Sequence, residues 1–120
     1  MKKYLVISFL ILVIVWIAWT NLTITTTKIK IENEKIPAEF DGFKIAHVSD
    51  LHNHQWEDQL TDKIKKESPD IIAITGDLVD SSITDIDIAL AFIKEANTIA
   101  PIYYVTGNHE AWLEDYQPLK

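Results

Sequence analysis

The sequence predicts an α/β protein in which an N-terminal transmembrane helix precedes a β-α-β-α-β unit with a parallel sheet. An uncharged apolar run occupies residues 4–19, near the start of the 120-residue chain. Behind it, three short apolar, β-branched segments alternate with two segments of helical periodicity. Strands that alternate with helices favour a parallel sheet with right-handed crossovers. The composition, 48% hydrophobic and 24% charged, is that of a globular protein.

The apolar run contains one polar residue, Ser8. As a helix of about 1.5 Å per residue, it spans about 24–28 Å, slightly less than a hydrocarbon core of about 30 Å. Interfacial tyrosine and tryptophan side chains extend such a span, and Tyr4, Trp16 and Trp19 are placed at its ends. We therefore expect residues 1–21 to form a membrane anchor, with residues 4–20 in contact with the membrane.

The anchor is either a transmembrane helix or an uncleaved signal. A cleavable signal peptide is the main competing interpretation, and a buried core helix is the third. Cleavage requires small residues at two positions, and the run ends with only a poor Ala18/Thr20 pair. Lys2 and Lys3 precede the run. Basic flanks stay inside, so we expect a single-pass protein of the cell membrane with residues 22–120 on the outer face.

Four segments have the residue types of β-strands. Three are short and apolar, and the middle one is continuously apolar, which is typical of a strand covered on both faces. The other, at the start of the domain, alternates apolar and polar residues but changes parity between Ile24 and Ile29, so we expect a bulge or a break there. The predicted strands are residues 22–32, 43–49, 71–75 and 102–106.

Two helices are predicted between these strands. The first covers residues 58–67, because Trp56, Leu60 and Ile64 recur every four residues and a Ser-Pro pair follows. The second runs from residue 84 to about residue 97, where Thr84 and Asp87 resemble a capping box.

Polar residues follow each of the three apolar strands. They form the clusters 50–54, 76–80 and 107–110, separated by about the length of one βαβ unit. Because the carboxyl ends of parallel strands meet at one edge of a sheet, we expect these clusters to lie together. Gly76 and Gly107 stand where a turn needs unusual backbone angles or a close backbone approach.

The clusters combine carboxylates, imidazoles and a side-chain amide, which are ligands of hard or borderline divalent metals. Asp50 and His52 are two residues apart, so we expect their side chains on the same side of the strand end. Asp77 carries two oxygens and is able to bridge two metal ions. His109 and Asn108 complete the polar set after the third strand.

Charge and composition exclude other chemistry. The chain has a net charge of −7, no cysteine and no arginine among its 11 basic residues. An acidic chain without guanidinium groups does not bind nucleic acid through a basic surface. Without cysteine, disulfide scaffolds and thiolate metal sites are also excluded.

The motifs Asp50-x-His52, Gly76-Asp77-x-x-Asp80 and Gly107-Asn108-His109-Glu110 occur in this order and spacing. Together they resemble the first three signature blocks of the calcineurin-like metallophosphoesterases, with similarity over about residues 28–110. The N-terminal anchor is similar to that of the membrane-associated bacterial branch of the family.

The resemblance implies that residues 22–120 form the N-terminal part, the first β-α-β-α-β half, of a four-layer α/β/β/α sandwich. It also implies two divalent metal ions, Mn, Fe, Zn or Mg, and hydrolysis of a phosphomonoester, phosphodiester or pyrophosphate. The anchor adds the expectation of a lipid or envelope phosphoester as substrate. By this resemblance, Asp50 and His52 hold the first metal, Asp77 bridges the two metals, and Asn108 holds the second. His109 makes a catalytic contact with the scissile phosphate. Asp80 orients these ligands.

The family's remaining ligands are a histidine and a Gly-His-x-His block further along the chain, whereas no histidine follows His109 here. We therefore expect a fragment, inactive by itself, rather than a degenerate protein or one completed by another chain. The alternative function is a non-catalytic, membrane-tethered α/β domain that binds metal or a partner. A receiver-like module is less suitable, because it needs five βα units and gives no reason for His52, Asn108 and His109.

Overall fold

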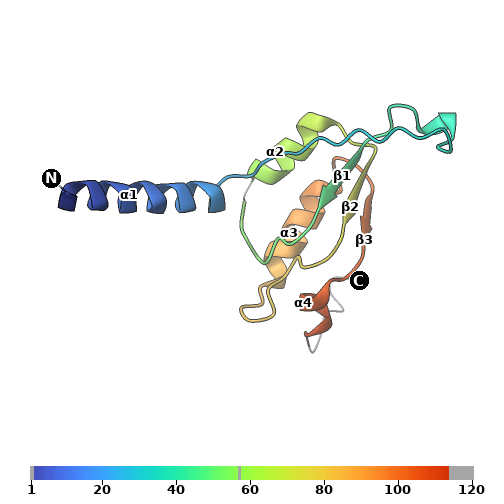
Figure 1. The fold of residues 1–120 in the computed structure, drawn as a ribbon. Helices are drawn as coiled ribbons and strands as arrows, with labels where there is room; N and C mark the ends of the chain where they lie inside the picture. Colours follow the sequence, from blue (N-terminus) through green and yellow to red (C-terminus); the bar gives the residue numbers. More distant parts are fainter. Residues whose placement is uncertain (1, 57, 114–120) are drawn as a thin grey trace.

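The computed structural model describes residues 2–56 and 58–113 (Figure 1). A long helix projects from a small body in which helices lie against a sheet. In chain order the elements are α1 (Lys2–Asn21), η1 (Ala38–Phe40), β1 (Ile45–Val48), α2 (Asp58–Glu67), β2 (Ile71–Ile74), α3 (Ile86–Ala96), β3 (Ile102–Tyr104) and α4 (Asn108–Ala111).

The sheet is parallel throughout, with the order β1-β2-β3. Its register pairs Val48 with Ile74 in one ladder and Ile74 with Tyr104 in the other. The three strands therefore end at one level, and the loops that follow them start side by side. The predicted β-α-β-α-β order and parallel pairing are confirmed, with each strand shorter than its predicted range.

The core lies on one face of the sheet. Ile72 and Ile74 of β2 are 0% and 1% exposed, and they belong to a single apolar cluster with Ile64 of α2 and Phe92 of α3. Both helices thus cover the same face of the sheet. Buried apolar residues shared between these elements hold α2 and α3 in place and fix the loops at the strand ends.

The opposite face of the sheet is open within the described residues. Ile45 and Tyr103 are 58% and 64% exposed, and Ile71 and Ala73 of β2 are half-buried. The prediction that the middle strand is covered on both faces is therefore wrong for the part of the chain that the structure describes. Apolar residues such as Ile71 and Ala73 tolerate partial exposure. A continuous apolar run therefore does not distinguish a strand covered on both faces from one covered on a single face.

The predicted strand at residues 22–32 is also wrong. This segment has no assigned strand and crosses the body as an irregular chain (Figure 1). Its alternating residues meet no strand partner among the described residues, and alternation alone does not form a ladder. Its contact with the body includes an ion pair of 2.6 Å between Lys28 Nζ and Glu67 Oε2 at the end of α2.

Helix α2 has its predicted bounds, and α3 begins two residues later than predicted. The N-cap is Asp85, whose side chain accepts a hydrogen bond from the Asp87 N–H at 3.1 Å. The Thr84 hydroxyl instead donates to the Asp80 carbonyl oxygen at 3.0 Å. Thr84 therefore closes the preceding loop, and the capping role falls to the neighbouring carboxylate.

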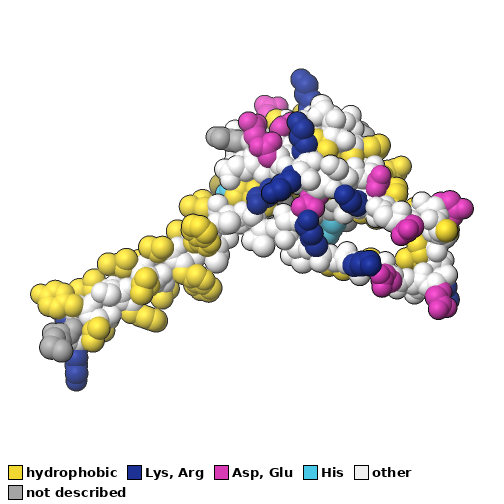
Figure 2. Space-filling model, turned by 90° about the horizontal axis from the view of Figure 1, so that it is seen from above, with side chains coloured by type: hydrophobic (Ala, Val, Ile, Leu, Met, Phe, Trp, Pro, Cys, Tyr) yellow, Lys and Arg dark blue, Asp and Glu magenta, His cyan; other side chains and the backbone are white. Residues whose placement is uncertain are grey.

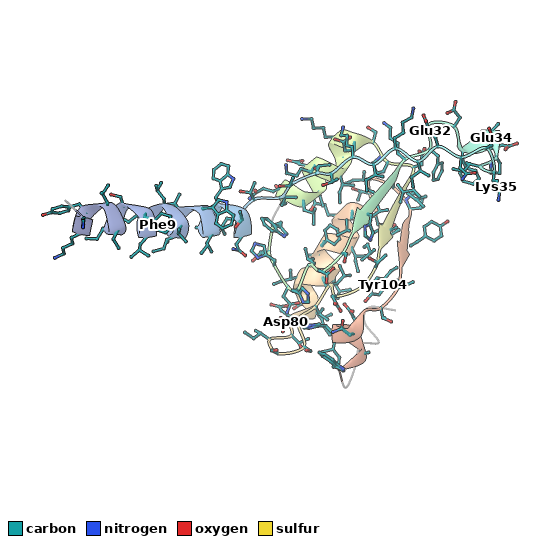
Figure 3. The ribbon with its side chains drawn as sticks, in the orientation of Figure 1. Phe9, Glu32, Glu34, Lys35, Asp80 and Tyr104 are labelled. Carbon is teal, nitrogen blue, oxygen red and sulfur yellow. The ribbon has the colours of Figure 1, made fainter. Side chains whose placement is uncertain are left out.

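Helix α1 is long and apolar enough to cross a membrane, with a mean hydropathy of 2.1 and none of its described residues buried. Apolar side chains surround it, whereas the visible face of the body carries many charged groups (Figure 2). Phe9 lies near the middle of this helix, remote from the body (Figure 3). Length and composition are those of a membrane span, and a signal sequence near the N-terminus has the same properties.

Candidate metal centre

The loops after β1 and β2 are joined along their backbones. The N–H groups of Asp50 and His52 donate to the carbonyl oxygens of Gly76 and Asp77 at 3.2 and 2.9 Å. Asn53 N–H continues the series, donating to a carbonyl of the second loop at 3.0 Å. The parallel pairing of the strands thus extends into the loops, which holds the first two polar clusters in fixed register.

Four residues of these loops adopt left-handed backbone angles, with φ of 57° for Asp50, 47° for His52, 57° for Asn53 and 52° for Asp77. Such angles are costly for residues other than glycine and gather at functional sites. Asp50 and His52 are therefore not extended, although the prediction that their side chains share one side assumed an extended strand end. Their side chains nevertheless converge, with Asp50 Oδ1 3.6 Å from His52 Nε2.

Gly76 and Gly107 mark a close crossing of the second and third loops. A Cβ atom on Gly76, whose φ is +91°, would lie 2.3 Å from the Gly107 backbone nitrogen. A Cβ atom on Gly107 would lie 2.2 Å from Asp77 Oδ1. Both glycines are therefore required by close approach, as the sequence predicts, and Gly107 leaves room for the Asp77 carboxylate.

One compact group of donors contains Asp50, His52 and Asp77. One ligand atom of each lies within 4.8 Å of the other two. His52 Nδ1 is buried and has no hydrogen-bond partner among the described residues, which leaves a nitrogen lone pair or N–H unsatisfied. Two carboxylates and an imidazole with an unsatisfied ring nitrogen fit a divalent metal ion.

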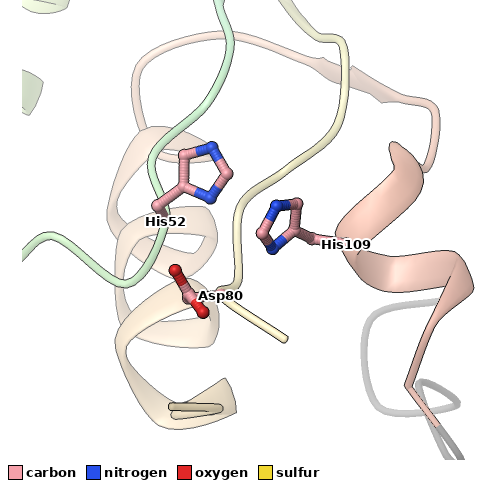
Figure 4. Close-up of side chains that lie close together, drawn as sticks. All are labelled: His52, Asp80 and His109. Atoms are coloured by element: carbon pink, nitrogen blue, oxygen red, sulfur yellow. The ribbon is translucent and has the colours of Figure 1, made fainter. Parts of the chain in front are cut away.

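A second group contains His52, Asp80 and His109, again with one ligand atom of each within 4.8 Å of the others (Figure 4). The rings of His52 and His109 are 4.5 Å apart between centroids and nearly perpendicular, at 78°. His52 belongs to both groups and links them. The structure therefore brings five of the six predicted site residues into one region at the carboxyl end of the sheet.

Figure 3 shows the position of this region in the fold. Asp80 lies at the carboxyl end of the strands, and Glu32, Glu34 and Lys35 lie at the opposite end of the body. The charged loop around residues 32–35 is therefore remote from the candidate site.

Asn108, the sixth predicted residue, is the first residue of α4 and is exposed. Its side chain makes no hydrogen bond within the described part of the chain. It directly follows Gly107, at the crossing with the loop that carries Asp77, so its backbone position is next to the two donor groups.

His109 is held from both its backbone and its ring. Its N–H donates to Asp77 Oδ1 at 2.9 Å, which orients the carboxylate. Its ring Nδ1 accepts a hydrogen bond from the Ser81 N–H at 3.1 Å, and the Ser81 hydroxyl is 3.2 Å from the same nitrogen. Trp112 packs against the ring, with centroids 5.4 Å apart. The imidazole is thus fixed in position beside His52.

Asp80 shapes its own turn as well as facing the histidines. Its Oδ1 accepts hydrogen bonds from the N–H groups of Ser82 at 2.7 Å and Ile83 at 3.4 Å. These bonds, that of Ser82 above all, lower the pKa of the Asp80 carboxyl despite an opposing effect of burial, and the nearby His109 contributes. Asp80 is therefore an ionised group beside His52 and His109.

Glu110 belongs to the third sequence motif, but its structural role was not predicted. Its side chain is 0% exposed. Its Oε2 accepts from the N–H groups of Asp77 and Gly107, both at 2.8 Å, and its Oε1 accepts from Leu78 at 2.7 Å and Val79 at 3.3 Å. A carboxylate placed three residues after a glycine turn was the available signal, since N3 glutamates bond back to the N-cap amide.

The Glu110 carboxylate has a lowered pKa. Burial raises the pKa, and the backbone hydrogen bonds from Asp77, Gly107 and Val79 outweigh it. An ionised, buried carboxylate with four backbone donors joins the second and third loops. The geometry of Asp77 and His109 therefore depends on a residue that does not face the donor groups.

Comparison with known proteins adds an independent line of evidence. Residues 43–120 match the family model described as calcineurin-like phosphoesterase. A Campylobacter jejuni protein named as an uncharacterized metallophosphoesterase is 28% identical over 95 residues, which are 75% of this chain and 25% of that protein. A Bacillus subtilis protein with the same type of name is 33% identical over 94 residues, covering 72% of this chain and 33% of the relative.

A Bos taurus protein named as a transmembrane protein with a metallophosphoesterase domain is 28% identical over 94 residues, or 74% of this chain and 21% of its own length. The chain thus spans about a fifth to a third of the length of the curated relatives that it matches. No solved structure matches the chain.

Proposed function

Since the chain belongs to the calcineurin-like phosphoesterase family, we propose that the whole protein is a metal-dependent hydrolase of a phosphomonoester, phosphodiester or pyrophosphate. The observation that carries this proposal is the group of Asp50, His52 and Asp77, whose ligand atoms lie within 4.8 Å of one another at the carboxyl end of a parallel sheet. This is the donor chemistry and the position that a divalent metal centre needs.

In the proposed site, two divalent ions, Mn, Fe, Zn or Mg, are held by this chain together with ligands from the rest of the whole protein. Asp50 and His52 would hold the first ion, Asp77 would be shared between the two, and Asn108 would contribute to the second. When bound, the ions neutralise phosphate charge and activate water. The absence of arginine from the sequence supports this assignment, because no guanidinium of this chain is available to neutralise a phosphate.

His109 is the proposed catalytic residue of this chain. Its ring lies next to His52, at 4.5 Å between centroids, and is oriented by Ser81 and Trp112. From this position it contacts the phosphoester and assists the departing oxygen. Asp80, ionised and close to both histidines, is a positioning residue that keeps their environment negative.

We also propose that α1 anchors the protein in the cell membrane, with the N-terminus inside and residues 22–120 on the outer face. The length and apolar composition of α1 and the name of the Bos taurus relative support anchoring. Lys2 and Lys3 support the orientation. An anchored phosphoesterase acts at the membrane surface, which favours a lipid or envelope phosphoester as the substrate.

The test is hydrolysis of a generic aryl phosphate by the full gene product, with and without Mn²⁺. Asp77→Asn should reduce the metal-dependent rate by about a hundredfold or more, because the bridging carboxylate is lost. The matched control is Asp62→Asn, on the exposed surface of α2, which should retain the wild-type rate. Activity that Asp77→Asn leaves unchanged would contradict the proposal.

For these 120 residues assayed by themselves, we propose metal binding with little or no turnover, because the sequence contains no Gly-His-x-His block. The alternative is a non-catalytic, tethered domain that binds one metal ion weakly or binds a partner. Calorimetry with Mn²⁺ discriminates between them. Two tight sites would exclude the alternative, and full-rate hydrolysis by this chain would exclude our expectation of inactivity.

A further inference from the structure

We propose that the backbone N–H of Ser81 fixes His109 in the tautomer that carries its proton on Nε2, which makes His109 a hydrogen-bond donor to the site and prevents it from binding metal. Two donor groups compete in this region, and they differ in whether His109 is a ligand. The choice between them depends on which ring nitrogen of His109 bears the proton.

The deciding contact is the hydrogen bond of 3.1 Å from the Ser81 N–H to His109 Nδ1. A backbone N–H only donates, so Nδ1 must offer its lone pair. In a neutral imidazole the proton then lies on Nε2. The opposite tautomer would place two N–H groups face to face and leave the Ser81 N–H of this part-buried contact without an acceptor, so we expect a preference of about tenfold or more for Nε2–H.

The Ser81 hydroxyl, at 3.2 Å from the same nitrogen, does not decide the tautomer. A hydroxyl rotates and either donates or accepts, so it adapts to both forms of the ring. The control over His109 therefore comes from the main chain, at the start of the loop between Asp80 and α3.

A protonated Nε2 has no lone pair for a metal ion, and Nδ1 is already engaged. His109 is thereby excluded from the group that it forms with His52 and Asp80, although the three are close enough to coordinate an ion. His52 differs, because its Nδ1 is buried without a partner in the described residues and its Nε2 is 3.6 Å from Asp50 Oδ1. The metal is therefore directed to His52, and His109 remains available to donate a hydrogen bond.

Ser81 is thus a positioning residue for His109. The tautomer assignment stands on the geometry alone. The further step, in which the Nε2–H donates to an oxygen of the phosphoester, rests on the proposed function.

The test is nuclear magnetic resonance of the full ¹⁵N-labelled chain in detergent micelles, at a pH at which imidazole is neutral. A scalar coupling across the hydrogen bond between the Ser81 amide nitrogen and His109 Nδ1 should be detected, with the Nδ1 shift of an unprotonated nitrogen. His54 is the internal reference, because its exposed ring makes no hydrogen bond within the described residues and averages between tautomers. A protonated His109 Nδ1, or shifts averaged as in His54, would overturn the proposal.

Two variants separate the main chain from the side chain. Ser81→Ala keeps the N–H and should retain both the coupling and the tautomer. Ser81→Pro removes the N–H and should abolish the coupling and move the ring toward a mixture of tautomers, with the contact of 2.7 Å between His47 Nε2 and Thr75 Oγ1 as a probe of the intact sheet. If the proline variant fails to fold, loss of the tautomer in Ser81→Ala would still refute the role of the main chain.

Addition of Zn²⁺ alone tests the consequence for metal binding. The ring nitrogens of His52 should shift on binding, while the Nε2–H of His109 and its coupling to Ser81 persist. Loss of the His109 Nε2 proton on metal addition would overturn the proposal. Persistence of the tautomer in a full gene product without metal-dependent hydrolysis would instead refute the proposed function and leave the tautomer assignment intact.

Discussion

The Glu110 carboxylate accepts a hydrogen bond from the backbone N–H of Asp77 at 2.8 Å, and through it the loop after β3 fixes the conformation of the loop after β2. Asp77 needs this support because its φ of 52° is unfavourable for an aspartate. A buried carboxylate is stable only with full hydrogen bonding, which four backbone donors provide. The geometry of the site is therefore maintained by Glu110, a buried residue that does not belong to either donor group.

Replacing Glu110 tests this support. Glu110→Gln removes the charge and turns an amide N–H₂ toward backbone donors, so we expect a loss of about 2–4 kcal/mol in the free energy of unfolding. Urea unfolding of the full chain in micelles measures it. Glu34→Gln, on an exposed loop, is the control and should change stability by no more than about 0.5 kcal/mol. Equal stability of both variants would show that Glu110 is not a structural support.

The lowered pKa of Glu110 predicts how stability depends on pH. A carboxyl whose pKa is lower in the folded state than its ordinary value of 4.5 binds fewer protons when folded. Its stabilisation is present above the unfolded pKa and is lost as the pH falls through the folded pKa. Between pH 7 and about pH 3 the wild type should therefore lose more stability than Glu110→Gln, as urea titrations at several pH values would show. Parallel pH profiles for the two proteins would contradict this.

The sequence predicted the sheet and the donor region well because both depend on periodicity and on strand direction. Polar residues directly after parallel strands must meet at one edge, and Asp50, His52 and Asp77 do so. Neither the left-handed angles of Asp50 and His52 nor the main-chain contact of Ser81 with His109 follows from periodicity, since both are set by loop geometry.

The failed expectations have physical reasons of the same kind. The alternation in residues 22–32 resembles a strand, but a strand exists only with a hydrogen-bonding partner, and the described residues offer it none. The burial of Glu110 was not predicted because a glutamate in a polar motif is usually exposed. Here four backbone donors compensate for its burial. Partners of this type are long-range and become visible only in three dimensions.

Gly76 and Gly42 form a natural pair for testing the close crossing of the loops. Gly42 has a φ of +75°, and no atom lies within 4 Å of the point that a Cβ atom would occupy, so Gly42→Ala should cost only the strain of the left-handed angle, about 1–2 kcal/mol. In Gly76→Ala the new methyl group would also lie 2.3 Å from the Gly107 nitrogen, which should raise the cost to about 3 kcal/mol or more. Thermal unfolding compares them, and equal losses would contradict a tight crossing.

Metal binding should stabilise the folded chain, because an assembled donor group binds an ion better than the unfolded chain does. At a Mn²⁺ concentration of about 100 times the dissociation constant, the expected gain is about 2.7 kcal/mol, visible as a higher melting temperature. Asp77→Asn should reduce this gain strongly, while Asp62→Asn, on the exposed surface of α2, should retain it. The quantity compared is the shift caused by metal within each variant, which removes any effect of the substitution on stability itself. If metal raised the melting temperature of both variants equally, Asp77 would not be a metal ligand.

The orientation of the chain in the membrane is testable with a single introduced cysteine, because the sequence contains none. Lys35 lies on the exposed loop at the end of the body remote from the candidate site (Figure 3). If Lys2 and Lys3 keep the N-terminus inside, Lys35→Cys should react with a membrane-impermeant maleimide in intact cells that express the chain. The unmodified chain is the blank, and the same variant after permeabilisation gives the full extent of labelling.

Labelling that requires permeabilisation would place the body on the inner side, and recovery of a shortened, soluble product would identify α1 as a cleaved signal instead of an anchor. Full labelling of an intact, membrane-bound chain would support a site that faces lipid and envelope phosphoesters outside the cell.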